Sequence, residues 1–226
     1  MTRSYGAHLE GVLAGGKPAK AFLGVSLKNR MSNPPNLRNS ILWLARYVPF
    51  SLVVIGDMYY RHNLMALRKM SLESATEAAI KEGRRIQRVA LRAIEDFGFS
   101  DRVEVITAAQ LMGWDDYSPM LQMVRELFAA SNEFAEDARS SAREYLGRVD
   151  PAGSGDHGKL NVLKEFVLEE VALSLQLYAQ GFILDVYPGD DLHALQGITS
   201  GRYPGSPFRC TGRTFISLDL SKVNQP

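Results

Sequence analysis

The sequence has little of what disulfides, metal centres and membrane spans require. Its 226 residues include a single cysteine, Cys210, which cannot form an internal disulfide. No apolar run reaches the roughly 18 residues of a membrane span, and the N-terminus lacks an apolar core followed by a cleavage site. The four histidines are far apart and lack metal-ligand spacing: His8, His62, His157 and His193. We expect a cytoplasmic protein with no metal, no cofactor and no membrane segment.

The sequence also lacks an excess of charge of either sign. Its 26 Lys and Arg residues against 25 Asp and Glu residues give a formal net charge of +1. Any surface that binds nucleic acid must therefore be local. Apolar residues make up 46% of the chain and charged residues 23%, which is ordinary for a globular protein able to bury a full core. No exposed heptad pattern demands a dimer, so we expect a monomer.

What is present is an alternation of short apolar segments with longer helical patterns. Strands are predicted at 19–26, 51–55, 102–106, 182–187 and 214–220. Helices are predicted around 41–45 and over 72–97, 116–146 and 160–180, with Gly98 as a C-cap and a loop over 147–159. This alternation predicts an α/β fold with a mostly parallel sheet and helices on both faces. We expect a partly ordered N-terminal arm over residues 1–19 and a single domain over residues 20–226.

Ser26 ends the first predicted strand, at the edge of the sheet where such folds bind ligands. Gly24, two residues earlier, points the same way and leaves space beside the hydroxyl. A serine so placed is a candidate nucleophile, and the alternative is a serine that caps the following turn. The esterase elbow does not match, because Lys28 stands where that motif needs glycine.

Glu170 lies within an apolar stripe of the helix predicted over 160–180. The stripe recurs at steps of three and four residues: Leu163, Phe166, Val167, Glu170, Ser174 and Leu177. A carboxylate there is costly unless it is paired or functional, so Glu170 either forms a buried bridge with an arginine or works in a pocket. Glu165 and Glu169 fall on other faces, and we expect both to be solvated.

A cationic stripe marks the helix predicted over 72–97. Its residues share an arc of roughly 100° on a helical wheel: Lys81, Arg84, Arg85, Arg88 and Arg92. The usual partner of such a stripe is a phosphate backbone, and the alternative is a solvated surface helix. Candidates for extending it are Arg61, Arg68 and Lys69.

The order and spacing of these features resemble the cyclodipeptide synthases over about residues 20–190. The segments that carry the resemblance are Gly24-Val25-Ser26-Leu27-Lys28-Asn29, Asn63-Leu64, Gly83-Arg84-Arg85, Phe166-Val167-Leu168-Glu169-Glu170 and Tyr187-Pro188-Gly189. The resemblance implies a Rossmann-like catalytic domain, similar to that of class I aminoacyl-tRNA synthetases. It also implies that two aminoacyl-tRNAs are joined into a cyclic dipeptide (diketopiperazine).

The resemblance further implies roles for individual residues. Ser26 would carry the aminoacyl group as an ester, Glu170 would bind and help deprotonate its amine, and Tyr187 would assist proton transfer. Asn29 would support this centre and Gly24 would keep the pocket entrance open. Phe22 and Phe166 would contact the substrate, and the basic stripe, Arg84 and Arg85 above all, would grip tRNA.

Two departures from the family pattern affect these expectations. Phe166 stands where the family usually has tyrosine, so a hydrogen bond to the substrate amine is missing or supplied elsewhere. Tyr187-Pro188 matches one branch of the family, whereas Asn29 matches the other. Tyr178 and Tyr203 compete with Tyr187 for its role.

Two alternative functions remain. The first is a non-catalytic tRNA-binding relative of the synthetases. The second is a serine hydrolase, although the sequence offers no Ser-His-acid set at recognisable positions.

Overall fold

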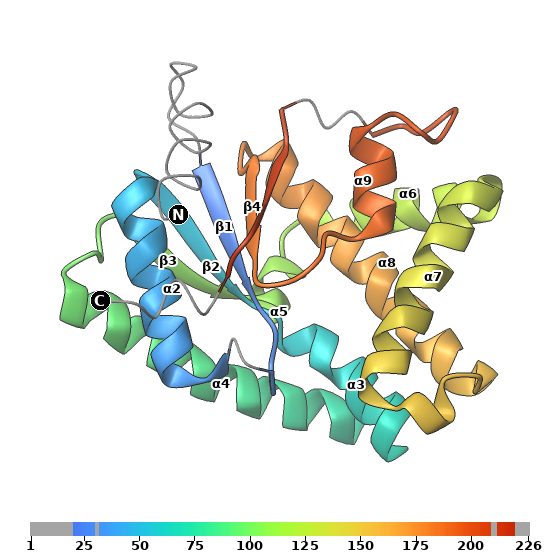
Figure 1. Cartoon of the computed structure of the whole chain (residues 1–226), viewed down its shortest axis with the longest axis horizontal. Coiled ribbons are helices and arrows are strands. Elements are labelled where there is room, and N and C mark those ends of the chain that lie inside the picture. Colours follow the sequence, from blue (N-terminus) through green and yellow to red (C-terminus); the bar gives the residue numbers. More distant parts are fainter. Residues whose placement is uncertain (1–19, 30–31, 209–211, 220–226) are drawn as a thin grey trace.

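The computed structural model describes residues 20–29, 32–208 and 212–219. Within them one parallel sheet has the strand order β3-β2-β1-β4-β5 (Figure 1). The strands are β1 (Lys20–Val25), β2 (Phe50–Ile55), β3 (Val103–Thr107), β4 (Leu184–Tyr187) and β5 (Thr214–Ser217). Helices on both faces complete the predicted α/β architecture, which is Rossmann-like. The arm expected over residues 1–19 lies outside the described residues.

The helices form two layers. They are α2 (Pro34–Tyr47), α3 (Asp57–Arg68), α4 (Leu72–Phe97), α5 (Ala108–Leu111), α6 (Tyr117–Ala130), α7 (Asn132–Val149), the 3₁₀ turn η2 (Pro151–Gly153), α8 (His157–Ala179) and α9 (His193–Thr199). One core cluster joins α2 and α4 to a face of the sheet, and a second joins the other face to α8 and its neighbours. No helix in the described part of the chain is long and apolar enough to span a bilayer.

The chain forms these elements where its sequence offers both a buried face and an end signal. Helix α4 begins at Ser71, whose side chain accepts a hydrogen bond from the Ser74 amide. It ends at Gly98, whose φ of +69° is the left-handed conformation that glycine adopts without strain, so the predicted C-cap is confirmed. The interior strand β2 is buried from Ser51 to Ile55, as its unbroken apolar run predicts.

Three predicted boundaries were wrong. The helical region 116–146 is two helices, because Ser131 breaks the first and caps the second by accepting from the Phe134 amide. The predicted loop 147–159 is shorter, since α7 continues to Val149 and α8 begins after its cap, Asp156. The helix around 41–45 starts at Pro34, because two prolines fit the first helical turn, where no backbone donor is needed.

Gly83 allows α4 to cross the start of α3. A Cβ added there would collide with the Cβ of Asp57, a buried residue that accepts hydrogen bonds from the amides of Met58 and Ala109. Gly83→Ala is expected to lower the free energy of unfolding by about 2 kcal/mol, because overpacking displaces this junction. Urea denaturation followed by circular dichroism measures the change. The matched control is Gly147→Ala in α7, where a Cβ meets open space; it should raise stability by up to about 1 kcal/mol. Equal effects of both substitutions would contradict the argument.

Candidate active site

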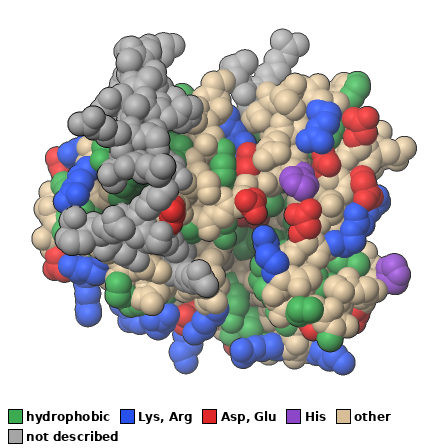
Figure 2. Space-filling view, in the orientation of Figure 1, with side chains coloured by type: hydrophobic (Ala, Val, Ile, Leu, Met, Phe, Trp, Pro, Cys, Tyr) green, Lys and Arg blue, Asp and Glu red, His purple; other side chains and the backbone are tan. Residues whose placement is uncertain are grey.

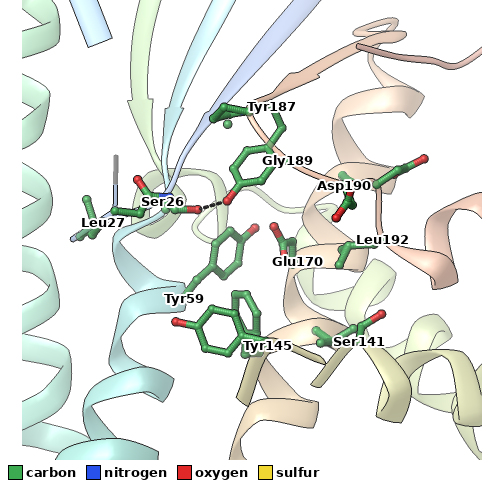
Figure 3. A pocket seen from close by; sticks show the side chains of 18 of the residues that line it. Ser26, Leu27, Tyr59, Ser141, Tyr145, Glu170, Tyr187, Gly189, Asp190 and Leu192 are labelled. Carbon is green, nitrogen blue, oxygen red and sulfur yellow. Dashed lines mark hydrogen bonds between the residues drawn. The ribbon is translucent and has the colours of Figure 1, made fainter. Parts of the chain in front are cut away.

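A cavity of about 410 Å³ opens at the carboxyl ends of β1 and β4. Figure 3 shows the side chains that meet in it: Ser26 after β1, Tyr187 at the end of β4, Glu170 from α8 and Tyr59 from α3. Seven residues predicted from sequence for the catalytic centre and the substrate contacts line it: Phe22, Gly24, Ser26, Asn29, Phe166, Glu170 and Tyr187. Elements more than 100 residues apart in the chain therefore converge on one pocket.

Ser26 and Tyr187 form a direct hydrogen bond. The Ser26 Oγ lies 2.9 Å from the Tyr187 hydroxyl, and the Asn29 side chain also bonds to that phenol. Burial raises the pKa of Tyr187 above its ordinary value, although these two hydrogen bonds oppose the shift. The phenol therefore keeps its proton at neutral pH and can share it with the serine oxygen.

Two glycines make room for the Tyr187 ring. A Cβ at Gly24 would lie 3.3 Å from Cδ2 of that ring, and one at Gly189 would lie 2.8 Å from Cε1. The space that Gly24 leaves is thus filled by Tyr187. The glycine of Tyr187-Pro188-Gly189 likewise admits the ring and sets its direction.

The turn after Ser26 forms an ion pair with α4. Lys28 has a φ of +59°, a left-handed conformation that is uncommon for a residue with a Cβ. Its Nζ lies 3.0 Å from Oε1 of Glu82, which also binds Arg85. The turn that carries the candidate nucleophile is therefore attached to the helix that bears the cationic stripe.

Glu170 faces the cavity without a partner among the residues described. No hydrogen bond or ion pair of its carboxylate is formed with them. Burial, together with the negative charges of Asp185 and Asp191, raises the pKa of Glu170 to about 8. A cationic group in the pocket would favour the charged carboxylate, so the site suits an ammonium ligand that also exchanges a proton.

The buried bridge considered for Glu170 is instead formed by Glu169, and the expectation that Glu169 is solvated was wrong. Its side chain is 8% exposed and receives Arg61 Nη2 at 2.6 Å and His62 Nε2 at 2.9 Å. The reason is that α8 is covered on most sides, and Glu169 faces α3. Arg61 is consequently no part of the cationic stripe.

The sequence did not reveal a buried ionic network that reaches the lining of the pocket through Asp185 and Asp191. Arg213, just before β5, donates to Asp185 of β4 at 2.8 Å and to Asp191 at 2.6 Å. Tyr178 donates to Asp185 at 2.7 Å and accepts from Arg213. A carboxylate inside the apolar run of β4 was the available signal, since such a group needs a partner.

The three tyrosines that competed for one role are now separated in space. Tyr178 belongs to the network around Arg213, and Tyr203 bonds to Asp137 between α7 and α9. Of the three, Tyr187 alone lines the cavity and reaches Ser26. No three His, Cys, Asp or Glu side chains in the described ranges are grouped to hold a metal ion.

The five cations of the α4 stripe are exposed as predicted and lie outside the cavity lining. Arg85 is paired with Glu82, whereas no ion pair is formed by Lys81, Arg84, Arg88 or Arg92 with any described residue. Basic side chains gather along the lower edge of the molecule, where α4 runs (Figure 2). This unpaired row is the feature that a polyanion would bind.

The fold and the pocket define a Rossmann-like α/β protein with a ligand site at the carboxyl ends of its strands. The family model "Cyclodipeptide synthase" matches residues 3–180. The chain therefore belongs to the cyclodipeptide synthase family, whose members are tRNA-dependent aminoacyltransferases. No curated protein sequence matches it significantly.

Solved structures of the same family share the fold at low sequence identity. AlbC, a cyclodipeptide synthase from Streptomyces noursei, is 18% identical, with a TM-score of 0.68 over 92% of this chain and 98% of that one. A Mycobacterium tuberculosis protein, described as relating cyclodipeptide synthetases to type I tRNA synthetases, is 17% identical, with a TM-score of 0.65 over 87% and 83%. The synthase from Candidatus Glomeribacter gigasporarum, solved bound to Phe-tRNAPhe, is 20% identical, with a TM-score of 0.63 over 94% and 95%.

Proposed function

We propose that this chain joins the aminoacyl groups of two aminoacyl-tRNAs into a cyclic dipeptide, with Ser26 as the covalent carrier. One observation carries the proposal: the Ser26 hydroxyl, bonded to Tyr187, and the unpartnered Glu170 carboxylate open into the same cavity. If Ser26 and Glu170 had only structural roles, the unpaired carboxylate and the convergence of both side chains on one cavity would have no explanation. Membership of the family agrees with it.

In the first step, the Ser26 Oγ attacks the carbonyl carbon of an aminoacyl-tRNA. An Oγ–C bond forms, the ester bond to the tRNA ribose breaks, and the serine proton passes to the ribose oxygen. The Tyr187 phenol, 2.9 Å from Oγ, is placed to relay that proton. An aminoacyl ester is already activated, so the step needs no ATP.

The second and third steps use the amine of each aminoacyl group. The Glu170 carboxylate takes a proton from the ammonium of the Ser26-bound group, and the free amine attacks the ester of a second aminoacyl-tRNA. The released ribose oxygen again takes up a proton. The amine of the resulting dipeptidyl group then attacks the Ser26 ester, which closes the ring and restores the serine hydroxyl. Covalent attachment holds the first amino acid in place for both steps.

Purified protein incubated with a mixed pool of aminoacyl-tRNAs tests the reaction. Mass spectrometry should detect a cyclic dipeptide that is absent when the tRNA has been deacylated, and its mass identifies both amino acids. Binding of tRNA without product would favour the non-catalytic relative instead. Product from free amino acid esters at the rate found with tRNA would contradict a tRNA-dependent enzyme.

The unpaired arginines of α4 are expected to bind tRNA phosphates. Arg84→Ala with Arg88→Ala should raise the KM for aminoacyl-tRNA by about 10-fold to 100-fold at low salt. It should also reduce the slope of log KM against log salt by about 2, roughly one for each phosphate contact. The control is Arg139→Ala with Arg143→Ala, an exposed pair at the same spacing on α7. An equal rise in KM for both pairs would indicate a response to net charge, with no specific role for the stripe.

A further inference from the structure

Tyr59 is a pocket residue that the sequence reading did not single out. It lies on α3, and its ring packs edge-on against Phe166 of α8, with 5.7 Å between the ring centroids. A Cβ at Gly56 would lie 3.1 Å from Cδ2 of the Tyr59 ring, so the ring is held closely at its base as well. These contacts aim the phenol into the cavity.

The Tyr59 hydroxyl makes no hydrogen bond with the residues that the structure describes. In Figure 3 it points toward the Glu170 carboxylate and the hydroxyl of Tyr187. Burial and the neighbouring Glu170 charge raise the pKa of Tyr59 well above its ordinary value, so the phenol stays protonated. A protonated phenol without a partner among those residues can accept and donate hydrogen bonds to a ligand in the cavity.

A second group on the same face of α3 supports a ligand at this position. Asn63, one helical turn after Tyr59, also lines the cavity, and its Oδ1 is buried without a hydrogen-bond partner. Oxygen acceptors therefore line both walls of the pocket: Tyr59 and Asn63 on α3, and Glu170 on α8. The wall from α8 offers no hydroxyl one turn before Glu170, because residue 166 is phenylalanine.

We propose that Tyr59 is a substrate-contacting residue whose phenolic oxygen accepts a hydrogen bond from the α-ammonium of the first aminoacyl group, opposite Glu170. The inference rests on the proposed function and names a binding group in the same site. An ammonium fits because it has three N–H donors and no acceptor, which matches a cluster of oxygens. A carbonyl oxygen could accept only from the Tyr59 hydroxyl and would leave the Glu170 carboxylate and the Asn63 Oδ1 without a donor.

Tyr59→Phe tests this assignment, because it removes one oxygen and keeps the ring that packs on Phe166. The amine is used after Ser26 has been acylated, so the variant should still acquire the aminoacyl adduct in intact-mass spectra. Cyclic dipeptide formation should fall by about 10-fold, and the adduct should accumulate relative to wild type. The control is Tyr117→Phe, which removes the same atom from a hydroxyl that is buried without a partner among the described residues and lies outside the cavity lining. That variant should match wild type.

The outcomes separate this inference from the function on which it rests. A wild-type protein that yields neither adduct nor product would overturn the proposed function, and the assignment of Tyr59 with it. A wild-type protein that yields both, beside a Tyr59→Phe variant with unchanged adduct and product, would overturn the assignment alone. A variant that loses adduct and product in equal proportion would also overturn it, because the defect would then precede use of the amine.

Discussion

Ser26→Ala is expected to reduce cyclic dipeptide formation by about 1,000-fold or more, to the level of buffer. The serine oxygen is the only atom of that side chain that can hold the first aminoacyl group while a second tRNA binds. Tyr187 loses its partner at 2.9 Å but keeps its ring between Gly24 and Gly189, so the pocket should survive. Product is measured by mass spectrometry, and the aminoacyl adduct by the intact mass of protein quenched in acid.

Ser51→Ala is the matched control for this loss. Ser51 lies on the neighbouring strand of the same sheet, and its Oγ is buried without a hydrogen-bond partner. The substitution removes the same atom outside the cavity lining and should leave both adduct and product unchanged. Wild-type product from Ser26→Ala would exclude the serine as carrier, and an adduct on that variant would place the ester on another residue.

Much of the fold could be predicted because its signals are local. Apolar runs such as the one ending at Ile55 predict buried strands, and parallel strands bring their carboxyl ends together. The predicted strands 19–26 and 182–187 end at Ser26 and Tyr187, so this argument puts both residues at one edge of the sheet, and the structure has them in one cavity. The cationic stripe was also predictable, since a helical wheel needs no tertiary information.

The rest depends on contacts between distant segments. The face of a helix occupied by Glu169 or Glu170 follows from the sequence, but the partner of that face does not. Whether a carboxylate meets an arginine or an empty cavity depends on how α3 packs on α8. Tyr59 was missed because no helix was predicted over residues 57–68, and because an aromatic side chain is usually part of the core unless packing leaves it beside a cavity.

Glu170→Gln is expected to slow cyclic dipeptide formation by about 100-fold and, at the same time, to stabilise the protein. The loss follows because an amide cannot take the proton of the substrate ammonium. The gain follows because a neutral side chain avoids the cost of a carboxylate with a raised pKa. At pH 7 the gain should be about 3 kcal/mol, or about 9 °C in Tm. Thermal unfolding at several pH values, beside rate measurements, checks both effects.

The raised pKa of Glu170 determines how the stability gained in Glu170→Gln depends on pH. The pKa of Glu170 rises from an ordinary value of 4.5 to about 8 in the folded chain. Between these values the folded state holds the proton and the unfolded state does not, so wild-type stability falls as pH rises. The advantage of Glu170→Gln should therefore be absent below about pH 4.5, grow through neutral pH and level off above about pH 8.

The neighbouring glutamate supplies a control with the opposite expectation. Glu169→Gln is the same substitution on the same helix, but it breaks a buried pair with Arg61 at 2.6 Å. It should cost about 3 kcal/mol, because the guanidinium is left buried without its counter-charge. If both variants lost stability at pH 8, Glu170 would have a structural partner. If Glu170→Gln kept the wild-type rate, the proton would leave the substrate amine by another route.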